Sequence, residues 1–356
     1  MKIVRASSAI EDFALTRPYA IAGQEPLSSV GNAIVHIETE RGLTGLGAAS
    51  PGEHVTGETL EACAKAISTE GLAWLVGRDV RTLPLLCREA ASRTPGTPAA
   101  RAAIDIALHD LLAQRLGVPL VEMLGRAHRE LPTSITIGIK SVAETLAEGE
   151  EYVGRGFRVL KVKIGDALDL DLERLAKLRE RIGPGVAIRV DANIGYTIEE
   201  TARFFEHRQA LAIEFVEQPV PREAFADIRT LPPRARARIA ADESLHDEKD
   251  ALALASPEPL CGIYNIKLMK CGGVRPAMRI AAIAETAGVA LMWGCMDESR
   301  ISIAAALHAA FASPATRFLD LDGSLDLARD VVEGGFTLED GVMRTTDAPG
   351  LGVTLL

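Results

Sequence analysis

Residues 159–191, VLKVKIGDALDLDLERLAKLRERIGPGVAIRVD, decide the fold, because two short apolar runs flank a stretch with helical periodicity. A short strand followed by a helix, repeated about every 25–30 residues, predicts βα units and a parallel sheet. The polar residues that end these runs and three later ones follow at steps of 28, 26, 25 and 25 residues: Lys163, Asp191, Glu217, Asp242 and Lys267.

The same period continues on both sides of this stretch. The alternating segment 132–138 precedes it, and Asp320 ends a further run 53 residues after Lys267, with the apolar run 289–293 halfway between them. Eight βα units close into a (β/α)₈ barrel of the TIM type, in which the C-terminal ends of the strands carry the chemistry. We therefore expect the polar residues at the strand ends to form the site.

The rest of the chain fits a second, smaller α+β domain. Residues 1–47 have strand patterns, and the stretches 16–32 and 50–57 are either lids over a site or ordinary surface loops. Residues 97–124 have helical periodicity, with Thr97 and Pro98 at its start. The predicted division is 1–125 for the small domain and 126–324 for the barrel, with 325–356 returning to the small domain as short strands.

Composition limits the possible functions. The 356 residues are 47% hydrophobic and carry a net charge of −10, which argues against nucleic acid or an anionic membrane as a partner. The five cysteines have no CxxC spacing, which is typical of free thiols in a reducing cytoplasm. The N-terminus lacks the apolar core of a signal peptide, and no run approaches the ~18–20 apolar residues of a membrane span. A homo-oligomer remains an open alternative.

Two lysines share one strand. Residues i and i+2 of a strand point the same way, so Lys161 and Lys163 face the barrel interior if Val162 faces the helices. Neighbouring ammonium groups in a partly dry site depress each other's pKa, which would make one of them a base near neutral pH. The alternative is a solvated edge strand, which the surrounding apolar residues disfavour.

Three acids end consecutive strands. Asp191, Glu217 and Asp242 would converge, and carboxylates so close repel each other unless a cation neutralises them. All-oxygen ligands suit Mg²⁺ before Mn²⁺, with Asn193 and Gln218 as hydrogen-bonding neighbours of the ligands. Ordinary salt bridges are the alternative for any one of these acids.

Lys267 ends the sixth predicted strand, across the barrel from Lys163. A metal between two opposed lysines suits the transfer of a proton from one face of a carbon to the other, with the resulting enediolate stabilised by the metal. Lys270 competes for this role, but Lys267 falls at the strand end.

At this point the chain resembles the enolase superfamily, muconate-lactonizing subgroup, over essentially its full length. The motifs that carry the resemblance are Lys161-Val-Lys163, Asp191-Ala-Asn193, Glu217-Gln-Pro219, Asp242-Glu-Ser244, the segment 265–273 and the segment 103–125. The resemblance implies Mg²⁺ at the three acids, Lys163 and Lys267 as the acid/base pair, and an α+β capping domain whose loops close over the barrel mouth.

Asp320 and Asp322 indicate the substrate. Two carboxylates at i and i+2 suit a ligand's ammonium group, and the dipeptide epimerases of this subgroup carry such a pair; Met296 lies in a segment similar to their seventh-strand motif. Relatives that act on L-Ala-D/L-Glu have an arginine where our alignment places Gln24, which argues against a glutamate side chain. Asp297 would suit a cationic side chain or simply start a helix.

The resemblance thus predicts an isomerase, a Mg²⁺-dependent dipeptide epimerase that inverts the α-carbon of the C-terminal residue. Lys163 would act on the L form and Lys267 on the D form, and Lys161 would lie near the substrate carboxylate. The alternatives are an N-succinylamino acid racemase, an o-succinylbenzoate synthase or a muconate-type cycloisomerase on the same scaffold, and a non-catalytic barrel that binds a carboxylate ligand.

Overall fold

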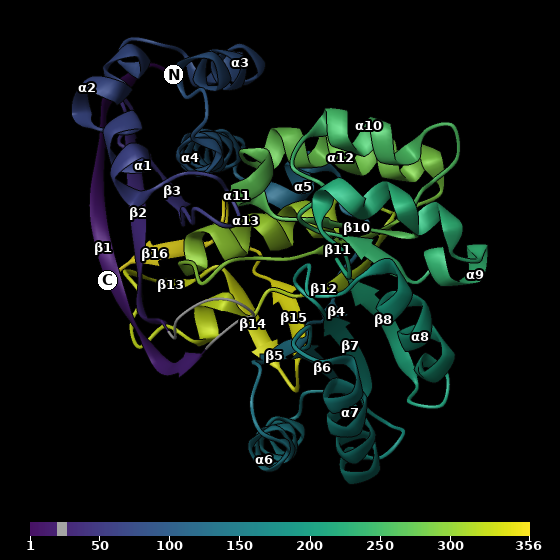
Figure 1. The fold of residues 1–356 in the computed structure, drawn as a ribbon. Coiled ribbons are helices and arrows are strands. Elements are labelled where there is room, and N and C mark those ends of the chain that lie inside the picture. Colours follow the sequence, from purple (N-terminus) through teal and green to yellow (C-terminus); the bar gives the residue numbers. More distant parts are fainter. Residues whose placement is uncertain (20–26) are drawn as a thin grey trace.

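The computed structural model describes residues 1–19 and 27–356, and an eight-stranded parallel sheet lies at its centre (Figure 1). The strands follow one another in chain order. They are β5 (Ile135–Ile137), β6 (Val159–Lys163), β7 (Ala187–Asp191), β8 (Ile213–Glu217), β9 (Ile239–Ala241), β10 (Ile263–Ile266), β11 (Ala290–Trp293) and β12 (Thr316–Leu319). A parallel bridge from Thr133 to Leu319 joins the two ends of the sheet and closes the barrel.

Helices connect successive strands and cover the outside of the barrel. They are α6 (Val142–Gly154), α7 (Leu168–Ile182), α8 (Ile198–Arg208), α9 (Pro233–Arg236), α10 (Glu248–Ala255), α11 (Leu268–Cys271), α12 (Val274–Ala287) and α13 (Arg300–Phe311), with 3₁₀ helices η3 (Arg222–Thr230) and η4 (Gly323–Leu325). Their starts follow from the sequence: Ser141 and Glu144 form a capping box before α6, which satisfies backbone donors that the helix itself leaves free. The predicted barrel is therefore confirmed.

An antiparallel sheet and a group of helices lie beside the barrel (Figure 1). The strands are β1 (Ile3–Tyr19), β2 (Leu27–Thr39) and β3 (Thr44–Ala49). The helices are α1 (Leu60–Ala66), α2 (Thr69–Leu72), η1 (Ala73–Leu75), η2 (Val80–Thr82), α3 (Leu83–Arg93), α4 (Pro98–Leu116) and α5 (Leu120–Leu124). The prediction of a loop over 16–32 was wrong at both ends. At the first end β1 continues to Tyr19, and at the second β2 already begins at Leu27, where Gly31 and Asn32 pair with Asp12 and Glu11.

Helix α4 contacts both the small sheet and the barrel through glycines. A Cβ on Gly47 of β3 would lie 1.8 Å from the Ala103 carbonyl oxygen, so only glycine allows this approach. On the barrel side, Gly273 has φ +114° and a Cβ there would meet the Asp105 side chain at 2.5 Å. Asp105 in turn accepts a hydrogen bond from Arg275 N in the first turn of α12, 3.2 Å away. The two parts of the chain therefore share a closely packed boundary.

The C-terminal residues form short strands, as predicted. These are β13 (Val332–Gly334), β14 (Phe336–Glu339), β15 (Val342–Thr345) and β16 (Val353–Leu355), with β13 paired to β16 and β15 paired to β4 (Leu131–Pro132). Leu327 forms an antiparallel bridge with Leu15 of β1. This tail thus contacts both the N-terminal sheet and the segment that enters the barrel.

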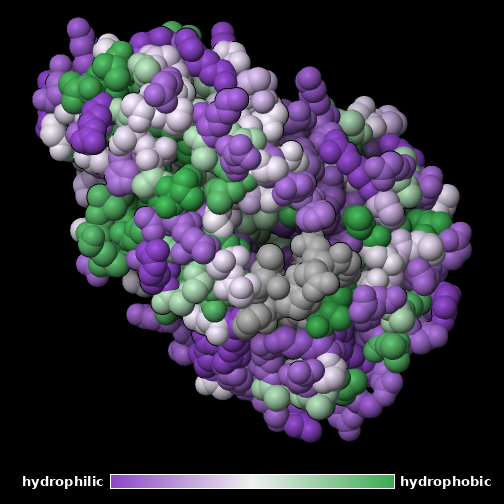
Figure 2. Space-filling model, turned by 60° about the vertical axis from the view of Figure 1, so that its left-hand side comes forward, coloured by the Kyte–Doolittle hydropathy of each residue, from purple (hydrophilic) through white to green (hydrophobic). Residues whose placement is uncertain are grey.

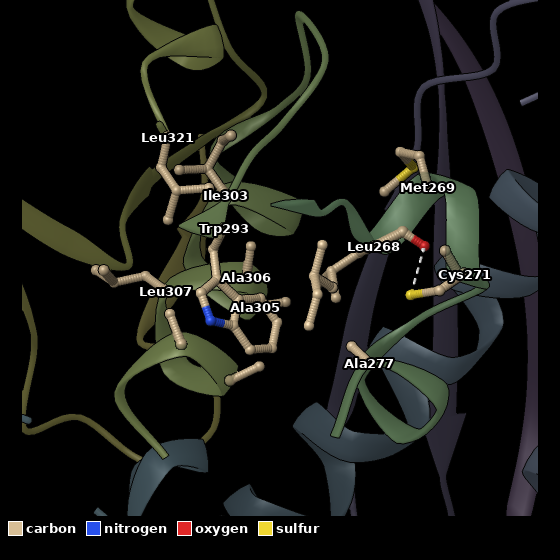
Figure 3. Close-up of a cluster of buried hydrophobic side chains, with 14 of the residues drawn as sticks. Leu268, Met269, Cys271, Ala277, Trp293, Ile303, Ala305, Ala306, Leu307 and Leu321 are labelled. Atoms are coloured by element: carbon tan, nitrogen blue, oxygen red, sulfur yellow. Dashed lines mark hydrogen bonds between the residues drawn. The ribbon is translucent and has the colours of Figure 1, made fainter. Parts of the chain in front are cut away.

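Apolar side chains fill the space between the barrel and its helices, and also the barrel floor. Figure 3 shows Trp293 of β11 packed among Leu268 and the small side chains of α13, and the Trp293 indole donates to Thr316 Oγ1 at 2.9 Å. A separate buried cluster lies inside the barrel: Phe215, Ala240, Ile263 and Met292, with Ala290 and Phe318 against it. This inner cluster is the apolar layer on which the polar strand ends rest.

The surface shown in Figure 2 is mostly hydrophilic, with hydrophobic side chains in separate groups. Among residues 1–19 and 27–356, none of the helices combines the length and the apolar character that a bilayer crossing requires.

His308 of α13 should make stability depend on pH. Its ring is fully buried, Nδ1 accepts from Val121 N at 3.0 Å, and burial lowers its pKa to about 4. Between pH 6.5 and 4 the unfolded chain binds a proton that the folded chain does not, so the free energy of unfolding falls as pH falls. His308→Asn keeps an acceptor for Val121 N but removes the titrating group. We expect it to reduce by about 3 kcal/mol the change in the free energy of unfolding between pH 4 and pH 7, measured by urea unfolding at each pH. Parallel profiles for the two proteins would contradict this assignment.

Candidate functional site

The polar strand ends gather at one mouth of the barrel. Lys163 pairs in register with Asp191, and Asp191 with Glu217. Asp242, Lys267 and Asp320 each come one residue after a strand. Because parallel strands end at the same edge, six polar groups from six strands lie above the apolar floor of the barrel.

A cavity of about 680 Å³ opens at this mouth. Lys161, Lys163, Asp242, Lys267, Asp320 and Asp322 line it from the barrel side. Arg17 at the end of β1 and the loop 50–55 line it from the N-terminal side. The loop 50–57, which the sequence left as either lid or surface loop, therefore forms part of a pocket with the size of a small-molecule site.

Lys163 and Lys267 stand on opposite walls. Their strands, β6 and β10, lie four places apart in the eight-stranded sheet. Lys163 Nζ lies 2.7 Å from Asp191 Oδ2 and 2.9 Å from Asn193 Oδ1, while Lys267 Nζ lies 2.8 Å from Asp242 Oδ2. Each amine is thus held by a carboxylate at the edge of the same cavity.

Lys161 lies deeper and contacts three acids. Its Nζ lies 2.7 Å from Asp320 Oδ2, 3.0 Å from Glu217 Oε2 and 3.1 Å from Asp191 Oδ2. Burial favours its neutral form, but the charges of Asp320, Glu217 and Asp191 outweigh burial and raise the pKa of Lys161 well above its usual value. The expected mutual lowering of pKa within the lysine pair is therefore wrong for Lys161, because acids surround it more closely than Lys163 does.

The three predicted ligands have different electrostatic surroundings. Although burial opposes ionisation, Lys163 and Lys161 lower the pKa of Asp191 to about 2, and Lys267 and Lys270 hold that of Asp242 far below its usual range. Burial and the charge of Asp191 raise the pKa of Glu217 to about 8.

The acid set fits a hard divalent cation. Asn265 Nδ2 donates to Glu217 Oε1 at 2.7 Å, but the buried Glu217 Oε2 accepts no hydrogen bond among the described residues, since Lys161 is close but poorly directed. A second cation would keep Glu217 ionised, and Mg²⁺ prefers such all-oxygen donors. Asp191, Glu217 and Asp242 are the residues that would hold it.

Asn193 and Gln218 support these acids through backbone and side-chain hydrogen bonds. Asn193 N donates to Asp191 Oδ1 at 3.0 Å, and Gln218 Oε1 accepts from Asp242 N at 3.0 Å and Ser244 N at 3.2 Å. Both residues have positive φ, +40° and +33°, which for residues other than glycine is costly and concentrates at functional sites. Asn193 therefore orients the Asp191 carboxylate, and Gln218 holds the backbone that carries Asp242.

Sequence reasoning missed several members of the site. Asn265 and Ser134 reach it from strand interiors or strand starts, where the search for polar strand ends did not look. Glu243 follows Asp242 directly, lines the cavity, and has its pKa raised to about 7 by burial and the charge of Asp242. Lys270, the rival of Lys267, instead donates to the Asp242 carbonyl at 2.6 Å and does not line the cavity.

Asp320 and Asp322 both face the cavity. Asp320 Oδ1 accepts from Ser134 Oγ at 2.5 Å, and Asp322 Oδ2 accepts from Thr136 N at 2.7 Å. Burial and the neighbouring charge of Asp320 raise the pKa of Asp322 to about 8. A ligand ammonium would therefore meet one ionised carboxylate and a second that it helps to ionise.

The remaining predicted residues lie around the cavity or outside the description. Met296 and Asp297 line the cavity after β11. Gln24 lies outside the described residues.

Comparison with known proteins gives matches over most of the chain. Residues 144–356 match the family described as enolase C-terminal domain-like, and residues 9–125 match the mandelate racemase / muconate lactonizing enzyme N-terminal domain. The chain is 61% identical to an L-Lys-D/L-Arg epimerase from Methylococcus capsulatus and 54% identical to one from Desulforapulum autotrophicum; each alignment covers 99% of both chains. A crystal structure of the dipeptide epimerase from Methylococcus capsulatus with Mg and L-Arg-D-Lys is similar with a TM-score of 0.98 and 61% identity, over 99% of this chain and 100% of that one.

Removing one carboxylate should weaken cation binding without affecting the fold. We expect Glu217→Gln to lower Mg²⁺ affinity at least about tenfold, measured by competition with Mn²⁺ in electron paramagnetic resonance. Glu214→Gln is the matched control, because Glu214 lies on the same strand but pairs with Arg189 away from the acids. Equal affinities for Glu217→Gln and Glu214→Gln would remove Glu217 from the cation site.

Proposed function

The chain belongs to the mandelate racemase / muconate lactonizing enzyme family of the enolase superfamily, and on that premise we propose that it is a Mg²⁺-dependent dipeptide epimerase. The observation that carries this function is the pair of opposed lysines across one cavity, in a chain 61% identical over its full length to a dipeptide epimerase. The reaction is a 1,1-proton transfer at the α-carbon of the C-terminal residue of a dipeptide.

Lys163 and Lys267 are the proposed acid/base pair. An α-carbon placed between opposite walls presents one face to each amine, so one lysine removes the proton and the other returns a proton to the opposite face. Lys163 serves the L form and Lys267 the D form. Asp191 and Asp242, which hold the two amines at 2.7 and 2.8 Å, keep each directed at the cavity.

Asp191, Glu217 and Asp242 are the proposed Mg²⁺ ligands. When bound, Mg²⁺ supplies positive charge that offsets the negative charge developing on the substrate carboxylate as the α-proton leaves. Lys161, whose raised pKa keeps it cationic, adds positive charge on the same side of the cavity.

Asp320 and Asp322 bind the free α-ammonium group of the dipeptide. This role disfavours the rival reactions, since N-succinylamino acids, o-succinylbenzoate precursors and muconate have no ammonium group to pair with these acids. A barrel that only binds carboxylates is disfavoured as well, because it would not need two amines on opposite walls.

The substrate side chains are proposed to be cationic. Asp326, Glu148, Glu53 and Asp297 all line the cavity, in addition to the acids already assigned. Glu148 pairs with Lys140 and Arg17, whereas burial and the charges of Asp297 and Glu148 raise the pKa of Asp326 to about 6, a shift that a cationic side chain nearby would oppose. Relatives that are 61% and 54% identical are L-Lys-D/L-Arg epimerases. Gln24 and Met296 remain proposed contacts of the side chains.

The division of labour between domains is also a proposal. We infer that residues 1–125, together with the returning tail 325–356, cap the barrel formed by 126–324, with the loop 50–57 over its mouth.

The five cysteines are free, which supports a reducing cytoplasm as the compartment.

Replacing either lysine should stop exchange from one epimer only. We expect Lys163→Ala to lower α-proton exchange from an L,L-dipeptide in D₂O with Mg²⁺ by about 10²–10⁴-fold, and Lys267→Ala to do so for the L,D-dipeptide. Lys177→Ala, which removes an exposed lysine of α7, is the control and should exchange both at the wild-type rate. Undiminished exchange in Lys163→Ala would refute its role as base.

The acidic cavity should select basic dipeptides. In a library of L,L-dipeptides monitored by mass gain in D₂O, we expect kcat/KM for substrates with Lys or Arg to exceed that for L-Ala-L-Glu by about tenfold or more. Preference for Ala-Glu would disprove the side-chain assignment while leaving the epimerase reaction intact.

A further inference from the structure

Arg189 of β7 is a buried arginine inside the barrel, below the proposed site. Its side chain crosses the interior, because Nη1 donates to the Leu319 carbonyl at 2.9 Å although β7 and β12 are not neighbours in the sheet. Nε donates to Glu214 Oε2 at 2.8 Å on the adjacent strand. Arg189 is buried and its bond to the Leu319 carbonyl is shielded from water, whereas the Glu214 side chain that it contacts is partly exposed.

Two aromatic rings lie close to this guanidinium. Its central carbon lies 4.8 Å from the centre of the Phe318 ring and 5.5 Å from that of Phe215. A planar guanidinium that donates in two directions and contacts two rings has a defined position, and the single ammonium of lysine cannot make all of these contacts. Arg189 is therefore a rigid link between β7, β8 and β12.

The Leu319 carbonyl is the point where the barrel closes. It accepts from Ser134 N at 3.1 Å, from Ser134 Oγ at 3.2 Å and from Arg189 Nη1. The closure rests on the Thr133–Leu319 bridge, whereas β6 and β7 pair over five positions. Among the described residues a single β-bridge spans this seam, and the bond from Arg189 Nη1 to the Leu319 carbonyl is a further contact that holds the end of β12 in place.

The next residue after Leu319 is Asp320. We propose that Arg189 is a positioning residue that, through the Leu319 carbonyl, places Asp320 at the height where it meets the substrate's α-ammonium group. This inference rests on the proposed function, and it assigns to the apolar floor of the barrel a part in substrate selection.

The test separates positioning of Asp320 from general loss of structure. Wild type and Arg189→Met are compared for α-proton exchange in D₂O with Mg²⁺ on L-Lys-L-Arg and on its N-acetyl derivative, which lacks the ammonium group. We expect kcat/KM for the free dipeptide to fall about tenfold, mainly through KM, and that for the N-acetyl dipeptide to stay within about twofold.

Two further variants keep the result interpretable. Arg179→Met removes an arginine that donates to the Gly183 and Val186 carbonyls outside the barrel, and should lower the melting temperature without changing the ratio between the two substrates. Arg189→Lys retains the charge and one donor, and should fall between wild type and Arg189→Met. If Arg189→Met does not fold, Arg189→Lys decides.

Equal losses of kcat/KM on both substrates in the folded variant would overturn the inference, as would no loss on either substrate. A wild-type enzyme that exchanges neither of these compounds nor any member of the L,L-dipeptide library would instead disprove the proposed function itself.

Discussion

The burial of like charges at the strand ends is the constraint on which the rest of the structure depends. Three carboxylates with almost no contact with water would repel each other and ionise poorly. The chain places four lysines against them: Lys161, Lys163, Lys267 and Lys270. The acids therefore stay charged, except that Glu217 has a raised pKa and an oxygen without a hydrogen bond. Where the lysines do not suffice, the proposed Mg²⁺ would complete the charge balance.

The closed barrel also determines where the charged groups lie relative to one another. Strands four places apart face each other across the cavity, so the two amines held by Asp191 and Asp242 lie on opposite walls, as the proposed proton transfer requires. A two-layered sheet could gather the same residues, but it would offer them along one line. In the proposed reaction, the closed sheet would determine which face of the carbon each lysine meets, and the surrounding charges would determine the acidity of each group.

Much of this was predictable from the sequence. The period of about 25 residues predicted the strands, because each βα unit contributes one strand. The polar residue at the end of each strand predicted which side chains gather at the barrel mouth. The loop over 16–32 was predicted too long, since Gly31 and Asn32 are typical of turns but continue a ladder here. The pKa of Lys161 could not be predicted, because its three acidic neighbours come from strands β7, β8 and β12. Ser134 and Asn265 were missed because Ser134 precedes β5 and Asn265 lies within β10, whereas the prediction considered only polar residues at strand ends.

The packing of helix α4 against the barrel limits how the two parts of this chain can be recombined with those of relatives. Its Asp105 provides the hydrogen-bond acceptor at the start of α12, and its surface fits against Gly273, six residues after Lys267. Grafting the N-terminal portion of one relative onto the catalytic half of another would therefore exchange loops around the cavity, but also the support beneath a reactive amine. Chimeras should retain α4 with its own barrel. The loops around the cavity can then be exchanged while the contacts that support the segment after Lys267 stay unchanged.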